Sequence, residues 1–153
     1  MRTRELQTEL WLPLPPEELF PFFGDAANLD AITPPWLHFR IVTPRPIVMR
    51  PGTLIDYRLR VRGLPLRWRT HIREWEPPVR FVDEQLRGPY RLWVHEHTFT
   101  PHDGGTLCRD RVTYAVPLDW LLHDTWVRPD IELIFAYRAE ALRRRFGQPA
   151  SPA

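Results

Sequence analysis

The sequence contains no lysine and a single serine, and these two absences exclude several classes of enzyme. All 21 basic residues are arginine, so no lysine can form a Schiff base or contact phosphate as the lysine of a P-loop does. The one serine, Ser151, lies in a proline-rich segment at the end of the sequence. We therefore exclude serine hydrolase, aldolase and P-loop NTPase chemistry.

Cysteine and long apolar runs are equally scarce. Cys108 is the only cysteine, so neither an internal disulfide nor a cysteine-cluster metal site can form. No apolar run approaches the roughly 18 residues needed to span a bilayer, and residues 1–5 lead into a strand pattern without the apolar core of a signal peptide. We expect a cytoplasmic protein that does not insert into a membrane.

The composition predicts a single folded domain. A chain of 153 residues is long enough to bury a sizeable core, and a hydrophobic fraction of 43% with 12% aromatic residues argues against disorder. We place the domain at residues 1–147 and predict that the short, proline-rich tail at residues 148–153 is disordered.

The formal net charge of +2 argues against nucleic acid as a partner, because arginines and acids nearly cancel. One predicted hairpin nevertheless carries an outward row of arginines, namely Arg58, Arg60, Arg62, Arg67, Arg69 and Arg73. A solvated strand face has the same pattern, and nucleic-acid binding also calls for interleaved aromatic residues. The row leaves open a module that contacts protein or RNA.

Alternation of apolar and polar residues predicts a strand-rich chain that ends in one long helix. The predicted strands are Glu5–Leu12, Leu37–Thr43, Thr53–Val61, Leu66–Trp75, Arg80–Arg87, Tyr90–Thr100 and Thr106–Val116. Two short helices are predicted, the first starting at Pro16 and the second running through Ala26–Ile32. A helical turn within Pro117–Asp124 and a long helix over Pro129–Phe146 follow the last strand. We expect Gly104 and Gly105 to form the turn between the last two strands.

The inward faces of these strands carry more polar groups than a closely packed core tolerates without partners. They include Tyr57, Thr70, His95, His97 and Asp110, and Cys108 shares the face of Asp110 as a small buried residue. A sheet that surrounds a partly polar, ligand-sized cavity is the simplest interpretation. For residues 80–87 the inward face is ambiguous: we favour Phe81, Asp83 and Gln85 over Val82, Glu84 and Leu86.

This order of elements resembles the helix-grip fold of the START, Bet v 1 and polyketide cyclase-like (SRPBCC) superfamily, across residues 3–147. The segments that carry the resemblance are residues 52–57, 75–83, 88–90, 93–99 and 110–114. The resemblance implies an α+β fold in which a curved antiparallel sheet of six to seven strands closes around the last helix and leaves a cavity. Similar proteins bind lipids, hormones or aromatic metabolites, cyclise polyketides or act on partner proteins, so the fold alone does not fix an activity.

The long helix predicts that Arg138 faces this cavity. At 100° per residue Arg138 falls at the centre of an apolar stripe, which contains Ile131, Ile134, Phe135, Leu142 and Phe146. Its stem could lie on apolar neighbours while its guanidinium pairs with an inward acid such as Asp83. Alternatively, Arg138 could bind the carboxylate or phosphate of a ligand, since arginine suits bidentate recognition of anions.

The pattern Trp93-x-His95-x-His97-x-Phe99 places two imidazoles on one face of a strand. Two histidines so spaced can chelate a metal if carboxylates such as Asp110, with Asp83 or Gln85, converge on it. They could also act as general acid and base beside a carboxylate. We favour hydrogen-bonded lining of the cavity, because no other residues show metal-ligand spacing, and we expect no metal and no cofactor.

We therefore predict a protein that binds a small hydrophobic ligand carrying an aromatic ring or an anionic group. The predicted ligand-binding residues are Tyr57, Trp68, Thr70, Asp83, Gln85, Trp93, His95, His97, Asp110, Tyr114 and Arg138. The first alternative is a cofactor-independent enzyme of the cyclase or dehydratase type, with His95, His97 and Asp110 as catalytic residues. The second is a partner-binding module that uses the arginine-rich outer sheet.

Overall fold

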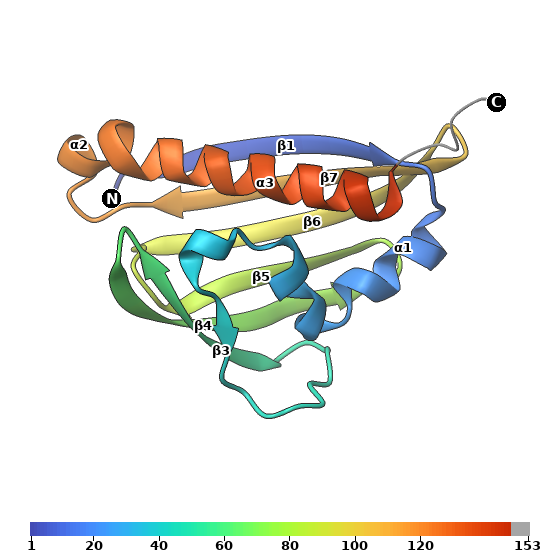
Figure 1. Ribbon diagram of the computed structural model, residues 1–153, viewed down its shortest axis with the longest axis horizontal. Helices are drawn as coiled ribbons and strands as arrows, with labels where there is room; N and C mark the ends of the chain where they lie inside the picture. The colour runs from blue at the N-terminus through green and yellow to red at the C-terminus, as the bar shows by residue number, and fades with distance from the viewer. Residues whose placement is uncertain (148–153) are drawn as a thin grey trace.

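A computed structural model describes residues 1–147 and shows one seven-stranded antiparallel sheet, in the order β1-β7-β6-β5-β4-β3-β2 (Figure 1). The strands are β1 (Arg4–Leu12), β2 (Arg40–Ile41), β3 (Leu54–Val61), β4 (Leu64–Glu76), β5 (Arg80–Arg87), β6 (Leu92–His102) and β7 (Gly105–Ala115). The tail predicted to be disordered lies outside the described residues. The predicted helix-grip fold is confirmed.

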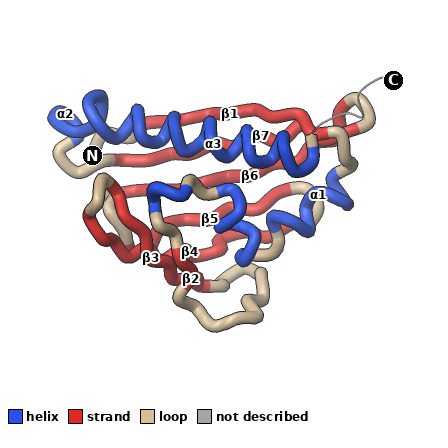
Figure 2. Tube along the Cα trace, in the orientation of Figure 1, coloured by secondary structure: helices blue, strands red, loops and turns tan. Residues whose placement is uncertain are grey.

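The helical segments lie on one face of this sheet (Figure 2). They are α1 (Pro16–Phe23), the 3-10 helices η1 (Ala26–Ile32) and η2 (Pro35–Leu37), α2 (Asp119–Leu122), the π-helix η3 (His123–Val127) and α3 (Arg128–Phe146). The long helix α3 runs beside β1 and also packs against η1. None of the described helices is long and apolar enough to cross a membrane.

Two tight turns set the register of the long hairpins. Arg62-Gly63 joins β3 to β4 and Asp103-Gly104 joins β6 to β7, and all four residues have positive φ, as a two-residue hairpin turn of this type requires. The predicted pairing of the last two strands is confirmed. The turn lies one residue earlier than expected, because Gly105 already belongs to β7.

Three segments differ from the sequence prediction. The strand expected over Leu37–Thr43 is only two residues long, since consecutive prolines start η2 and His38 then takes a left-handed conformation at φ 47°. The second short helix is a 3-10 helix rather than an α-helix. The helical turn predicted before the long helix is split into α2 and the π-helix η3.

The core lies between the sheet and its helices. Phe20 of α1 packs edge-on against Phe81 and Phe99 at ring-centroid distances of 5.9 and 5.2 Å, an arrangement favoured by aromatic quadrupoles. From α3, three members of the predicted stripe, namely Ile131, Phe135 and Leu142, are buried. Helix and sheet are therefore held together on either side of the polar residues described next.

Candidate functional site

A cavity of about 180 Å³ lies between the sheet and the segment formed by α1 and η1. We call it the inner cavity. Most of its wall is apolar and comes from Phe22, Phe23, Ala26, Leu29, Ile32, Met49, Ile55, Trp68, Ile72 and Phe81. The polar part of the wall comes from Asp25, Asn28, Tyr57, Thr70, Asp83, His95, His97 and Arg138. Seven of the predicted ligand-binding residues therefore line one cavity.

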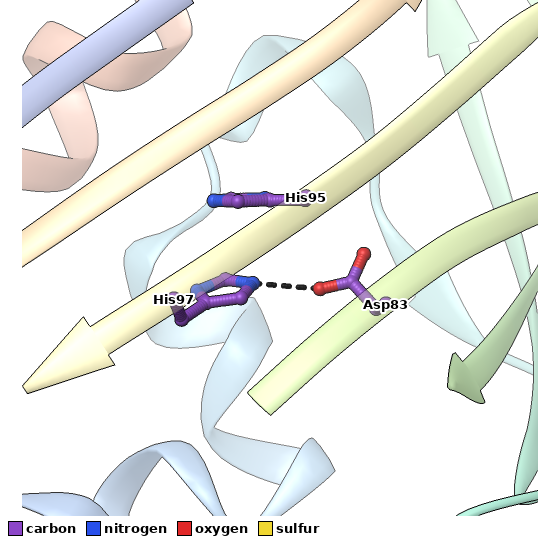
Figure 3. A group of neighbouring side chains, drawn as sticks. All are labelled: Asp83, His95 and His97. Carbon is purple, nitrogen blue, oxygen red and sulfur yellow. Dashed lines mark hydrogen bonds and ion pairs between the residues drawn. The ribbon is translucent and has the colours of Figure 1, made fainter. Parts of the chain in front are cut away.

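Strand register brings a cluster of ionisable residues to one side of this cavity. Asp83 on β5 lies opposite His95 on β6, and His97 on β6 lies opposite Asp110 on β7. Arg138 reaches the same place from α3. We call these five residues the buried charge cluster. Figure 3 shows Asp83 beside His97 and the ring of His95 stacked on that of His97.

His97 is held between two carboxylates. Its Nε2 lies 2.6 Å from Asp83 Oδ2 and its Nδ1 lies 3.3 Å from Asp110 Oδ1. Burial alone would lower the pKa of His97, but the hydrogen bonds to Asp110 and Asp83 outweigh it and raise that pKa. An Nη atom of Arg138 lies 3.4 Å from the same Nδ1, but Asp110 Oδ1 is closer to Nδ1, at 3.3 Å, and is an acceptor only. We therefore assign the Nδ1 proton to Asp110 and treat His97 as an imidazolium.

The pKa of His95 shifts in the opposite direction, although His95 contacts the same Asp110 carboxylate. Its Nε2 lies 2.7 Å from Asp110 Oδ1, and its ring stacks on the ring of His97 at a centroid distance of 3.6 Å and an angle of 21°. Burial and the charge of His97 lower the pKa of His95 more than Asp110 raises it. His95 is then a neutral imidazole that donates its Nε2 proton to Asp110. Within residues 1–147, the side-chain hydrogen bond of His95 is made through Nε2 and none is made through Nδ1.

Arg138 points inward, with 13% of its side chain exposed, and its nearest carboxylate oxygen is Asp110 Oδ1 at 3.6 Å. We expected Asp83 to form an ion pair with Arg138, but Asp83 is bound to His97 instead. The guanidinium carbon lies 5.7 Å from the ring centre of Phe23 and 6.0 Å from that of Phe135, within the range of cation–π attraction. The Nε atom of Arg138 is buried without a hydrogen-bond partner among the described residues.

With His97 protonated, the charges of the cluster balance. Burial raises the pKa of Asp110, but Arg138 and the two histidines outweigh burial and hold that pKa well below its usual value. The pKa of Asp83 is also lowered, because the hydrogen bond and charge of His97, together with the charge of Arg138, outweigh its burial. Two carboxylates are thus matched by the His97 imidazolium and the Arg138 guanidinium. A buried network that is satisfied in this way holds its members in fixed positions.

The buried charge cluster is less suited to binding a metal ion. Asp83, His95 and His97 each offer a ligand atom, and these atoms lie within 4.8 Å of one another. However, the imidazoles are stacked almost parallel, so their in-plane lone pairs cannot converge on one ion as tetrahedral coordination requires. Both nitrogens of His97 already face carboxylates. The geometry suits hydrogen bonding and proton transfer better than chelation.

The other four predicted residues lie outside the lining of the inner cavity. Asp110 stands behind the histidines and also accepts a hydrogen bond from Thr8 at 3.3 Å. Gln85 makes two hydrogen bonds to the backbone of Tyr90: its amide nitrogen donates to the carbonyl oxygen, and its amide oxygen accepts from the N–H group. Trp93 packs against Trp68 and Tyr90. Tyr114 is hydrogen-bonded through its hydroxyl to His123 at 2.7 Å, away from the cluster.

Sequence reasoning missed the wall of the cavity that faces the sheet. That wall comes from α1, from η1 and from Met49, in the loop before β3. The apolar side chains of α1 were visible as a helical pattern, and burial of Phe22 could have been inferred from it. Met49 lies in a proline-rich loop without periodicity, so no sequence signal pointed to its place in the cavity.

Comparison with known proteins agrees with this architecture. The structure resembles protein CV1439 of Chromobacterium violaceum, with a TM-score of 0.71, 14% identity, and 95% and 99% of the two chains covered. It also resembles major latex-like protein 151 of Panax ginseng, with a TM-score of 0.69, 10% identity, and 94% and 97% covered. For protein Ms6760 of Mycobacterium smegmatis the TM-score is 0.65, with 18% identity and 95% and 96% covered.

At these identities the likeness concerns the fold. No curated protein matches the sequence. The family model described as polyketide cyclase/dehydrase and lipid transport matches residues 12–143, which include the whole buried charge cluster. The resemblance to the SRPBCC superfamily is thereby confirmed, and the chain belongs to the polyketide cyclase/dehydrase and lipid transport family.

Proposed function

We propose that the protein binds an uncharged molecule of about the size of one aromatic ring in the inner cavity, with a hydroxyl or carbonyl group directed at the buried charge cluster. The observation that carries this proposal is the combination of an apolar, partly aromatic wall with four members of the buried charge cluster, Asp83, His95, His97 and Arg138. The volume of about 180 Å³ limits the size, since an apolar cavity of about 150 Å³ holds benzene. A long lipid chain exceeds this volume, and a fused two-ring system fits it less well than a single ring.

The charge balance of the cluster favours a neutral ligand over an anion. Asp83 and Asp110 are already matched by His97 and Arg138, so a bound carboxylate would leave an excess negative charge in a buried site. A hydroxyl group could donate a hydrogen bond to Nδ1 of His95, while a carbonyl could accept one from a cation of the cluster. Tyr57, Trp68 and Thr70 would contact the ring itself.

Binding of probes of graded size tests this proposal. We expect phenol to bind with a one-to-one stoichiometry in calorimetry, naphthol to bind more weakly, and palmitate not to displace phenol. His95→Gln should weaken phenol binding by about 5-fold, because one buried hydrogen bond is altered. His71→Gln is the matched control, since His71 also faces a carboxylate, Glu84, at 3.0 Å, but on the outer face of the sheet. Tight binding of palmitate without binding of phenol would contradict the proposal.

A second candidate function is cofactor-independent proton transfer, and the neutral state of His95 favours it. Asp110 orients the imidazole through Nε2, which leaves Nδ1 as a base, and the adjacent His97 imidazolium keeps it unprotonated. A carboxylate-oriented imidazole of this kind can remove a proton next to a carbonyl group. His95 would be the catalytic base and Asp110 its positioning residue.

Deuterium exchange into cyclohexanone separates this second candidate from simple binding. In heavy water, the wild-type protein should accelerate exchange of the protons next to the carbonyl, as observed by NMR. His95→Gln should reduce that acceleration by roughly 100-fold, whereas His71→Gln should leave it unchanged. If the wild-type protein binds the ketone without accelerating exchange, the catalytic candidate is eliminated and the binding function stands.

A further inference from the structure

One end of the molecule exposes an unusual set of large apolar side chains. Its members are Leu64 at the tip of the β3–β4 hairpin and Leu118, Trp120, Leu121 and Trp126 in and around α2 and η3. Trp120 is 82% exposed and Leu64 is 67% exposed. We call this set the apolar end. Figure 1 shows α2 and the hairpin tip at the same end of the molecule, so the segments that carry the five residues lie at one end.

Direct contacts tie the two parts of this end together. Arg62, two residues before Leu64, lies with its guanidinium carbon 5.3 Å from the ring centre of Trp126. The same guanidinium makes a bidentate contact with Asp130 of α3, at 3.0 and 3.1 Å. These contacts join the hairpin tip to the helical segment. Five exposed apolar residues on one fixed surface exceed the scattered exposure that is normal for a protein surface.

The hairpin beside the apolar end is strongly basic. Arg58 on β3 lies directly opposite Arg67 on β4, and Arg40 on β2 lies opposite Arg58. Cross-strand neighbours of like charge are unfavourable. Within residues 1–147, Arg58, Arg60 and Arg67 form no ion pair, whereas the acids Asp119, Asp130 and Glu132 at this end are paired with Arg4, Arg62 and Arg128. Among the described residues, Asp124 on η3 contacts only the imidazole of His123, so three unpaired arginines outnumber one acid without an arginine partner, and the balance at this end is positive.

We propose that the apolar end docks on the surface of an anionic lipid bilayer. Tryptophan and leucine side chains would enter the headgroup region, and the unpaired arginines of the hairpin would contact lipid phosphates and other anionic headgroups. A second copy of the chain fits this end less well, because a two-fold axis would bring identical arginine rows together. Docking of this kind needs no membrane-spanning helix and does not depend on what the inner cavity binds.

Co-sedimentation with vesicles tests the proposal. The wild-type protein should bind vesicles of phosphatidylcholine mixed with phosphatidylserine, bind vesicles of phosphatidylcholine alone at least about 10-fold more weakly, and dissociate as salt is added. Trp120→Ser should weaken binding by about 10-fold or more, since burial of a tryptophan is lost. The matched control is Trp36→Ser, because Trp36 is exposed by 49% but lies on η2.

Charge variants give a second, independent measurement. The double variant Arg58→Gln/Arg67→Gln should weaken binding to the anionic vesicles by about 10-fold, whereas Arg143→Gln/Arg144→Gln at the other end of α3 should not. Circular dichroism before each assay ensures that only folded variants are compared. The proposal is overturned if the wild-type protein fails to sediment with anionic vesicles, if Trp120→Ser binds as the wild type does, or if the apolar end instead mediates a dimer that excludes vesicles.

Discussion

Replacement of Asp83 with asparagine is the most direct test of the buried charge cluster. Asp83 Oδ2 lies 2.6 Å from His97 Nε2, and the two side chains are 18% and 7% exposed. A charge-assisted hydrogen bond contributes about 1.5 to 3 kcal/mol, and removal of one partner of a buried ion pair can cost about 3 to 5 kcal/mol. The upper limit is not reached here, because His97 can lose its proton. We expect a loss of about 2 to 3 kcal/mol.

The pH dependence of this loss follows from the two pKa directions. The pKa of His97 is raised on folding, so its contribution is complete below the ordinary histidine value of about 6.5 and is lost as the pH rises through the folded value. The pKa of Asp83 is lowered, so its contribution is present above about 3.9 and is lost on acidification through the folded value. The difference between wild type and variant should therefore be largest between these limits.

The neighbouring residue provides the control. Glu84 follows Asp83 on β5 but points to the outer face, where its Oε1 lies 3.0 Å from His71 Nδ1 and both side chains are more than a fifth exposed. Glu84→Gln should cost no more than about 1 kcal/mol, because solvent screens an exposed pair. Urea unfolding of both variants across the pH range measures the difference. Equal losses for Asp83→Asn and Glu84→Gln would refute the assignment of His97 as a buried imidazolium.

Three further predictions concern single residues. NMR titration should give His95 a pKa below, and His97 a pKa above, the ordinary histidine value; two similar values would contradict the assigned protonation states. Burial raises the pKa of Cys108 to about 12, so iodoacetamide at about pH 8 should label the unfolded but not the native protein. Gly105→Ala should lower the unfolding free energy by about 1 to 3 kcal/mol, since its new Cβ would overlap the Leu12 carbonyl and the Trp11 ring. An unchanged thermal midpoint would contradict this prediction and show that β1 can shift to make room for the methyl group.

The fold could be predicted because its elements follow local rules. Alternation along residues 66–72 and 106–114 identifies half-buried strands, and Asp103-Gly104 marks a tight hairpin. The inward direction of Arg138 follows from its position in the apolar stripe of α3. The failure at residues 37–43 has a local cause as well: prolines favour extended or turn geometry without a ladder, and an alternating apolar pattern there does not produce a strand.

The partners within the cluster could not be predicted, because they depend on register and on rotamers. Arg138 meets Asp110 rather than Asp83 because Asp83 is bound to His97, a contact across β5 and β6 that depends on strand register and on side-chain rotamers. The opposite pKa shifts of two histidines that are two residues apart arise from their stacking and from the double contact of His97. Both are properties of the assembled site.

The two sides of the inner cavity differ in rigidity, and this difference affects which ligands the cavity can accept. Asp83, His95 and His97 stand on strands that are paired along both edges, so their backbones are among the last parts of the fold to open. The facing wall comes from the 3-10 helix η1 and from the loop that contains Met49, where hydrogen bonding is weaker and an unbranched side chain can repack. For the ligand proposed above, the buried charge cluster would select the polar group, whereas η1 and Met49 would set the size of ring that fits. Substitutions at Leu29 or Met49 should change which ring fits, and substitutions in the buried charge cluster should change which polar group it must carry.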